Sequence, residues 1–121
     1  MSMKLPNIFE GEVTPLSVSA GEAIYSEGET PNAMYVVKSG EVELKVRGKS
    51  LEVVGPEGFF GEMALIDQSR RAATAVAKTD CTIIPISEKH FLFMVEEMPL
   101  FALIVMRAMI ARLRRLDMFK Q

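Results

Sequence analysis

Short runs in which hydrophobic and polar residues alternate cover most of residues 13–86, and turn residues separate them. The run over residues 41–47 is the clearest, because apolar and charged side chains alternate along its whole length. Successive side chains of a strand point to opposite faces, so this pattern predicts a strand with one buried and one solvated face. Residues 34–38 precede it, and Ser39-Gly40 between the two runs favours a tight turn. We therefore predict that residues 34–38 and 41–47 pair as a hairpin.

The same kind of pattern predicts further strands at residues 16–18, 23–26, 51–54, 72–77 and 82–86. Residues 27–32 hold a dense cluster of turn-forming residues and are predicted to form a loop. The sequence thus contains about seven or eight short strands at the regular spacing that is typical of an all-β barrel or sandwich.

The pattern changes to helical spacing after Ser87, which is a suitable N-cap with Glu88 in the first turn. Pro99 ends this first helix and suits the start of a second, which we predict over residues 100–117. The second helix carries an apolar seam with residues three and four apart, namely Leu100, Leu103, Met106, Ile110 and Leu113. We predict that this seam is core on one side, with a homodimer interface as the alternative. The arginines off the seam, which are Arg107, Arg112, Arg114 and Arg115, are predicted to form a solvated face.

Length and composition indicate one domain over residues 1–121 that is mainly β with flanking helices. A β-roll is expected at about residues 13–86 and C-terminal helices at about residues 87–118. Residues 1–12 are weakly patterned, and a turn of helix packed on the domain edge is the expectation there.

The composition argues against several classes of protein. The net charge of −2 lacks the basic excess of a dedicated nucleic-acid binder. The single cysteine, Cys81, excludes an internal disulfide and favours a reducing compartment. The N-terminus lacks the apolar core of a signal peptide, and the longest apolar run, residues 100–106, is far below the roughly 18 residues of a membrane span. We therefore expect a cytoplasmic protein with no membrane span.

The candidate chemistry is concentrated in residues 59–77. Glu62 is an acceptor for a sugar hydroxyl, and Arg71 offers the planar fork of donors that suits phosphate. Ala64 and Ala72 are small, so their backbone N–H groups can approach the same anion, and Gly61 permits close approach of the backbone to a sugar. The plainer alternative is a structural ion pair between Glu62 and Arg71.

This segment resembles the phosphate-binding cassette of cyclic-nucleotide-binding domains, as found in the catabolite activator protein and in the regulatory subunit of cyclic-AMP-dependent kinase. The resemblance rests on residues 61–66 and 71–74, and it extends over nearly the whole chain through residues 20–22, 27–29, 34–37, 39–40 and 59–62, which look like the markers of that family's β-roll. It implies a double-stranded β-helix, or jelly-roll-like β-roll, followed by helices.

The resemblance also implies roles for individual residues. Ligand binding would fall to Gly61, Glu62, Met63, Ala64, Arg71, Ala72 and Ala73. Glu62 would bind the ribose and Arg71 the phosphate. Family members that favour cyclic GMP often have threonine directly after this arginine, so Ala72 favours cyclic AMP while leaving cyclic GMP open. The C-terminal helix would cover the base, with Met106, Arg107 and Ile110 as candidates for that lid.

One residue departs from the kinase-type pattern, which has proline where this chain has Arg70. The departure leaves open which arginine faces the phosphate, although the spacing from Glu62 favours Arg71. Arg70 is otherwise read as a solvated charge.

The sequence predicts a regulatory sensor without catalytic activity, cofactor or metal, in which ligand binding moves the last helix. A cupin-type enzyme is disfavoured because one histidine and one cysteine cannot supply a metal-ligand set. Direct DNA binding is not expected, because no helix-turn-helix follows the last helix in this sequence. The remaining alternative is an interaction module that keeps the β-roll and binds another small anion or a protein partner. In either case the sequence does not identify the effector protein.

Overall fold

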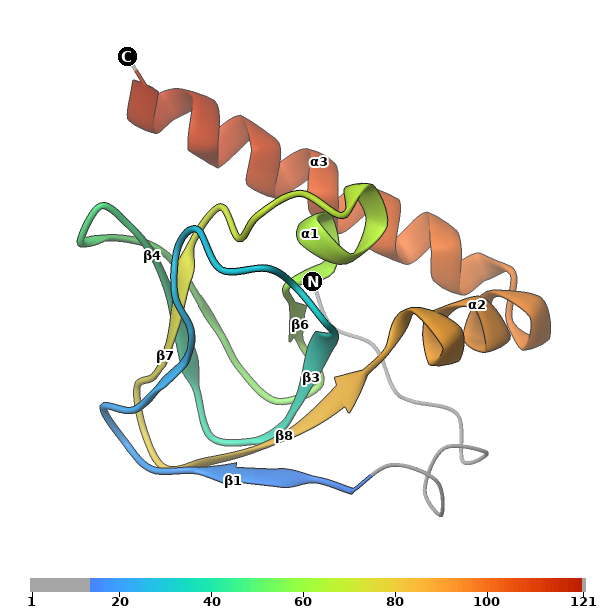
Figure 1. The fold of residues 1–121 in the computed structure, drawn as a ribbon, viewed down its shortest axis with the longest axis horizontal. Coiled ribbons are helices and arrows are strands. Elements are labelled where there is room, and N and C mark those ends of the chain that lie inside the picture. Colours follow the sequence, from blue (N-terminus) through green and yellow to red (C-terminus); the bar gives the residue numbers. More distant parts are fainter. Residues whose placement is uncertain (1–13, 121) are drawn as a thin grey trace.

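The computed structural model describes residues 14–120, in which two four-stranded antiparallel sheets are followed by helices (Figure 1). One sheet has the order β1-β8-β3-β6, with β1 at Leu16–Val18, β8 at Cys81–Ile86, β3 at Met34–Ser39 and β6 at Phe59–Phe60. The other has the order β2-β7-β4-β5, with β2 at Ala23–Tyr25, β7 at Thr74–Ala77, β4 at Val42–Val46 and β5 at Lys49–Val54. The predicted fold class is confirmed. The turn of helix expected in residues 1–12 lies outside the described residues.

The predicted hairpin is wrong, because β3 and β4 belong to different sheets. β3 pairs with β8 and β6, whereas β4 pairs with β5 and β7. Ser39-Gly40 is therefore a corner between the sheets and not a hairpin turn. The corner passes so close to the chain at Asp80 that a Cβ on Gly40 would lie 2.3 Å from the Asp80 carbonyl oxygen. Gly40 also has φ of 84°, so both its conformation and its surroundings require glycine.

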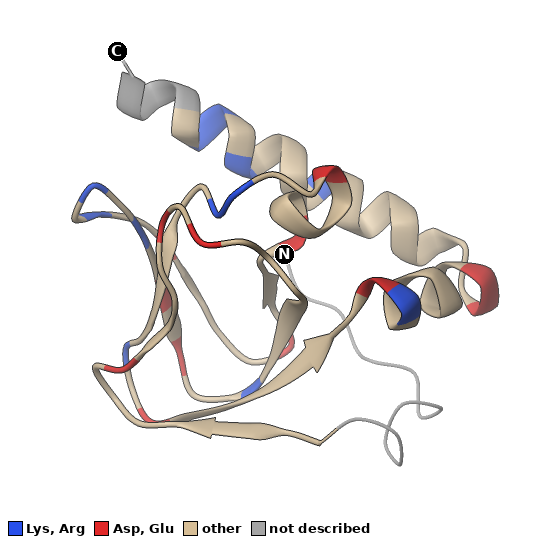
Figure 2. Ribbon diagram, in the orientation of Figure 1, with Lys and Arg blue, Asp and Glu red and all other residues tan. Residues whose placement is uncertain are grey.

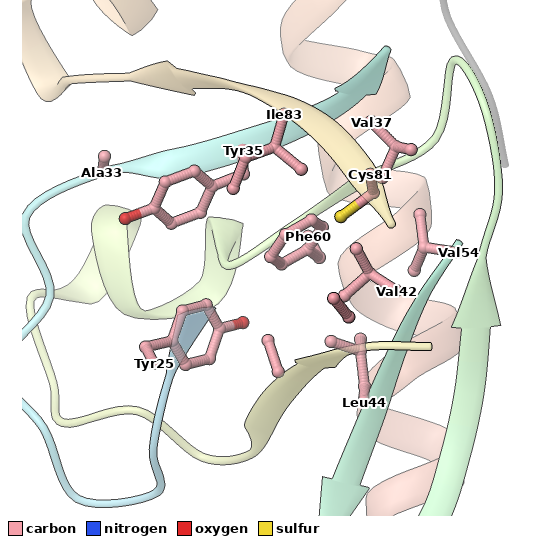
Figure 3. Close-up of a cluster of buried hydrophobic side chains, with 12 residues drawn as sticks. Tyr25, Ala33, Tyr35, Val37, Val42, Leu44, Val54, Phe60, Cys81 and Ile83 are labelled. Carbon is pink, nitrogen blue, oxygen red and sulfur yellow. The ribbon is translucent and has the colours of Figure 1, made fainter. Parts of the chain in front are cut away.

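Two hydrophobic clusters lie on opposite sides of β3, because its side chains alternate between them. Tyr35 and Val37 belong to the cluster between the sheets, which also contains Tyr25, Phe60 and Val42 (Figure 3). The side chains of β3 that point the other way join a second cluster beneath the helices, formed by Met34, Val36, Phe59, Leu65, Ile86, Met94, Phe101, Val105 and Ala108. β3 therefore contributes side chains to both hydrophobic cores, the one between the sheets and the one beneath the helices.

Three helices cover one side of the roll (Figure 1). α1 is a short helix at Glu62–Asp67 between β6 and β7, α2 spans Glu88–Glu97, and α3 spans Leu100–Lys120. Ser87 caps α2 as predicted, because its hydroxyl accepts the N–H of His90. None of these helices is both long and apolar enough to cross a bilayer, as far as the described residues go.

The apolar seam predicted as core on α3 is solvent-exposed. All five of its members are exposed, from Leu103 at 38% to Leu100 at 69%. The residues that pack on the roll are Phe101, Val105 and Ala108, which have the same three-and-four spacing on another face of the helix. Spacing alone does not choose between two apolar faces, so the prediction that this seam is core is wrong.

The corner at Gly40 can be tested by a pair of alanine substitutions. Gly48 has φ of 79° and no atom within 4 Å of an added Cβ, so Gly48→Ala carries only the conformational cost of about 1–2 kcal/mol. Gly40→Ala adds overlap with the backbone at Asp80, and we expect it to lower the free energy of unfolding by about 1–3 kcal/mol more. Urea unfolding of both variants measures the difference, and equal losses would contradict the close crossing.

Candidate functional site

The segment from β6 to β7 forms a loop around the short helix α1. Gly61 adopts φ of 82° just before α1, and Gln68 adopts φ of 57° just after it, so left-handed residues bracket the helix. A Cβ on Gly61 would lie 2.8 Å from Nη1 of Arg71, and the glycine therefore lets the guanidinium reach the backbone. The hydrogen bond from Arg71 to the Gly61 carbonyl oxygen therefore joins the two ends of the loop, which are ten residues apart in the sequence.

This loop forms one wall of a cavity that encloses about 450 Å³, including open solvent at its mouth. All seven residues proposed from the sequence as the core of the ligand site line it, namely Gly61, Glu62, Met63, Ala64, Arg71, Ala72 and Ala73. The rest of the lining comes from β2, β4, β5 and α3 and from loop neighbours, and it consists of Tyr25, Leu44, Leu51, Ser69, Arg70, Arg112 and Leu116. The cavity thus has a polar wall on the loop and apolar residues from β4, β5 and α3.

Arg71 is a buried cation at this wall, with only 4% of its surface exposed. Its Nη1 donates to the Gly61 carbonyl oxygen at 2.9 Å, and its Nη2 donates to the Ala33 carbonyl oxygen at 2.6 Å. The centre of the guanidinium lies 4.0 Å from the centroid of the Tyr25 ring. No carboxylate of the described residues forms an ion pair with it. The alternative of a Glu62–Arg71 ion pair is therefore not what this structure contains.

Glu62 is paired instead with Arg112 from α3, and both side chains are buried, with 2% and 7% exposed. Arg112 also donates to the Phe59 carbonyl oxygen and, through Nε, to the Glu52 carboxylate at 2.8 Å. The prediction that Arg112 belongs to a solvated face is wrong, because Arg112 continues the packing face of α3 four residues after Ala108. The sequence carries no signal for this burial, because the packing face and the exposed seam of α3 have the same spacing.

The carboxylate of Glu52 on β5 accepts from two arginines of α3, Arg112 and Arg115. Burial acts to raise the pKa of Glu52, but the hydrogen bond from Arg112 and the charges of Arg112 and Arg115 outweigh it and lower that pKa. Glu52 is therefore ionised at neutral pH and helps to balance the charge of Arg112. Figure 2 shows the basic residues of α3 on the same side of the roll as the arginine-bearing loop between α1 and β7.

The structure does not bring the three lid candidates to the cavity. Met106, Arg107 and Ile110 are all exposed and do not line it. The residues of α3 that do line it are Arg112 and Leu116, further along the helix. Met106 and Ile110 belong to the exposed seam and Arg107 is exposed beside them, so none of the three contacts the cavity in this structure.

Arg70 differs from Arg71 in its surroundings. Its side chain is exposed, and its Nη1 donates to the Gly28 carbonyl oxygen at 3.0 Å. Arg70 thus contributes to the rim of the cavity, whereas Arg71 contributes to its wall. Within the described part of the chain, no three side chains of His, Cys, Asp or Glu gather as a metal site would require.

The network around Arg112 can be tested by comparing it with Arg115, which pairs with the same Glu52 but has 47% of its side chain exposed. Arg112→Met leaves Glu62 buried without its cation, and we expect a loss of about 3–5 kcal/mol in the free energy of unfolding. Arg115→Met removes an exposed pair, which is worth less than about 1 kcal/mol. Urea denaturation of the two variants measures this, and losses of similar size would disprove the assignment of Arg112 as the buried partner.

Comparisons with known proteins identify the family of this chain. The sequence model of the family described as "Cyclic nucleotide-binding domain" matches residues 15–98. The chain is 32% identical over 103 residues to the cyclic AMP receptor protein of Thermus thermophilus, covering 81% of this chain and 48% of that protein. It is 39% identical over 66 residues to a cAMP-dependent protein kinase regulatory subunit of Eremothecium gossypii, covering 54% of this chain and 14% of that protein.

The fold is similar to that of the catabolite activator protein of Thermus thermophilus, with a TM-score of 0.77 and 27% identity, covering 92% of this chain and 60% of that structure. The chain spans about half the length of the first of these relatives and a smaller part of the kinase subunit. The sequence match and the β-roll with its loop between β6 and β7 lead to the same conclusion: the chain belongs to the cyclic-nucleotide-binding domain family.

Proposed function

We propose that the chain binds a cyclic nucleotide, with cyclic AMP preferred, and that binding changes the position of α3. The observation that supports this most strongly is the environment of Arg71. A buried guanidinium, which pairs with no carboxylate among the described residues, lines a cavity beside the small residues Ala72 and Ala73. A buried charge is stable only when it is compensated, and an anionic ligand in this cavity would complete the compensation.

The phosphate would bind at Arg71. Two of the five guanidinium N–H donors are used by the Gly61 and Ala33 carbonyl oxygens, so others remain for phosphate oxygens. The backbone N–H groups of Ala64 and Ala72 are assigned as additional donors, because both residues line the same cavity with small side chains. A cyclic nucleotide carries one negative charge, which matches the single charge of Arg71.

The ribose would bind at Glu62 through its 2′-hydroxyl. The two carboxylate oxygens of Glu62 accept from Arg112 and from the Met63 backbone N–H, and a carboxylate has further lone-pair sites for a hydroxyl donor. Because Arg112 belongs to α3, a ligand that hydrogen-bonds to Glu62 changes the strength of the Glu62–Arg112 ion pair that holds this helix. This shared carboxylate is the proposed route from ligand to helix.

The base would lie among Leu44, Leu51 and Leu116, which supply the apolar part of the cavity. Ala72 has no hydroxyl to offer a guanine, which supports the preference for cyclic AMP over cyclic GMP. A lid role for Met106, Arg107 and Ile110 would require α3 to rotate or shift, since all three are exposed in this structure.

Calorimetric titration with both cyclic nucleotides tests this proposal. We expect binding of both, tighter for cyclic AMP.

Arg71→Ala should weaken binding by about 2–5 kcal/mol, because the phosphate loses its charged partner. Arg70→Ala is the matched control, since it removes the same charge from an exposed neighbour, and it should cost less than about 1 kcal/mol. A folded protein that binds neither nucleotide at high micromolar concentration would refute the proposal, and the reverse ranking would show that the phosphate faces Arg70.

We further propose that a second copy of this chain covers the exposed seam of α3. The seam repeats every three or four residues through Leu103, Met106, Ile110 and Leu113, the spacing of a coiled-coil contact, and a two-fold axis would place it against itself. Sedimentation equilibrium should show a dimer for the wild type and a monomer for Ile110→Glu. Leu92→Glu changes an apolar residue on α2 that is exposed at least as much, and it should leave the dimer intact. A wild type that remains monomeric at high micromolar concentration would contradict this arrangement.

A further inference from the structure

Tyr25 lines the cavity from β2, outside the loop that carries the other polar groups. Its ring belongs to an aromatic cluster with Tyr35 on β3 and Phe60 on β6, at centroid distances of 6.2 Å and 6.0 Å (Figure 3). Tyr25 is the member of this cluster that also reaches the cavity. Its ring is therefore held by the core on one side and faces the ligand wall on the other.

The ring of Tyr25 and two carbonyl groups together fix the guanidinium of Arg71. The Gly61 and Ala33 carbonyl oxygens set the direction of its two η nitrogens, while the Tyr25 ring lies against it with Cζ 4.0 Å from the centroid. The Tyr35 ring is further away, at 6.0 Å from the same atom. Gly61 leaves room for the guanidinium in this position, since a Cβ there would lie 2.8 Å from Nη1 of Arg71.

An aromatic ring is well suited to this position because it stabilises a cation without neutralising it. A carboxylate at the same place would form an ion pair and compete with an incoming phosphate. The negative face of an aromatic ring attracts a guanidinium, and the attraction is stronger where water is excluded, as it is at this buried pair. Arg71 therefore keeps its positive charge for a ligand while its orientation is already set.

We propose that Tyr25 is the positioning residue of the phosphate site: its ring holds the Arg71 guanidinium in the orientation that a cyclic nucleotide phosphate requires, before the ligand arrives. This inference rests on the proposed function, because it assigns the phosphate to Arg71. It adds a residue from β2 to the recognition of the phosphodiester.

Three variants separate positioning from core packing. Tyr25→Phe keeps the ring and should bind cyclic AMP within about threefold of the wild type, whereas Tyr25→Leu removes the ring face and should bind about tenfold more weakly. Tyr35→Leu is the matched control, because it takes a ring from the same buried cluster but from a greater distance to Arg71. It should stay within about threefold of the wild type, as expected for a weaker contact with the cation. Calorimetry gives the affinities, and urea unfolding shows whether the two leucine variants lose comparable stability.

Equal loss of affinity in Tyr25→Leu and Tyr35→Leu would overturn the proposal, since affinity would then follow core stability. An unchanged affinity in Tyr25→Leu, with a wild type that binds, would also overturn it while leaving the proposed function intact. A wild type that does not bind at all is instead a failure of the proposed function.

Nuclear magnetic resonance of the free wild-type protein supplies a readout that needs neither ligand nor a variant that folds. The side-chain protons of Arg71 should be shifted upfield by the Tyr25 ring, and its η protons should give separate signals because the two carbonyl groups restrain rotation. Averaged η signals at ordinary positions would show that the guanidinium is not held in the free protein, and the proposal would fall.

Discussion

The buried guanidinium of Arg71 is the constraint around which the proposed ligand site is arranged. It requires a glycine at residue 61 so that the backbone can approach, a carbonyl group from Ala33, and the face of Tyr25. The carbonyl groups accept hydrogen bonds from the guanidinium, and together with the Tyr25 ring they lower the free-energy cost of burying it. No described carboxylate neutralises the charge of Arg71. The site is thus built to retain a positive charge at a wall that a small anion can reach.

Arg112 is also a buried arginine, but its charge is paired with carboxylates. Two carboxylates, Glu62 and Glu52, surround it, so this cation is fully compensated within the protein. Arg112 connects α3 to the β6–β7 loop through Glu62 and to β5 through Glu52. Because Glu62 serves both this contact and the proposed ribose site, we propose that Arg112 holds the helix and that Arg71 receives the phosphate.

The sequence predicted what is local and missed what depends on distant partners. Glu62 and Arg71 could be identified because they lie nine positions apart in one loop. Arg112 could not, because its partner Glu62 is 50 residues away and nothing in the spacing of α3 distinguishes its packing face from its exposed seam. The hairpin failed for a related reason: Ser39-Gly40 has the composition of a tight turn, but burial on both sides of β3 places its partners elsewhere.

The most direct test of this account is a crystal structure of the protein with cyclic AMP, in which the distances from the phosphate oxygens to the surrounding arginines are measured. The account predicts that phosphate oxygens lie about 2.7–2.9 Å from the Arg71 guanidinium, as in charge-assisted hydrogen bonds, with the 2′-hydroxyl on Glu62. A phosphate held by Arg70 or Arg112, with Arg71 still turned toward its carbonyl groups alone, would contradict it.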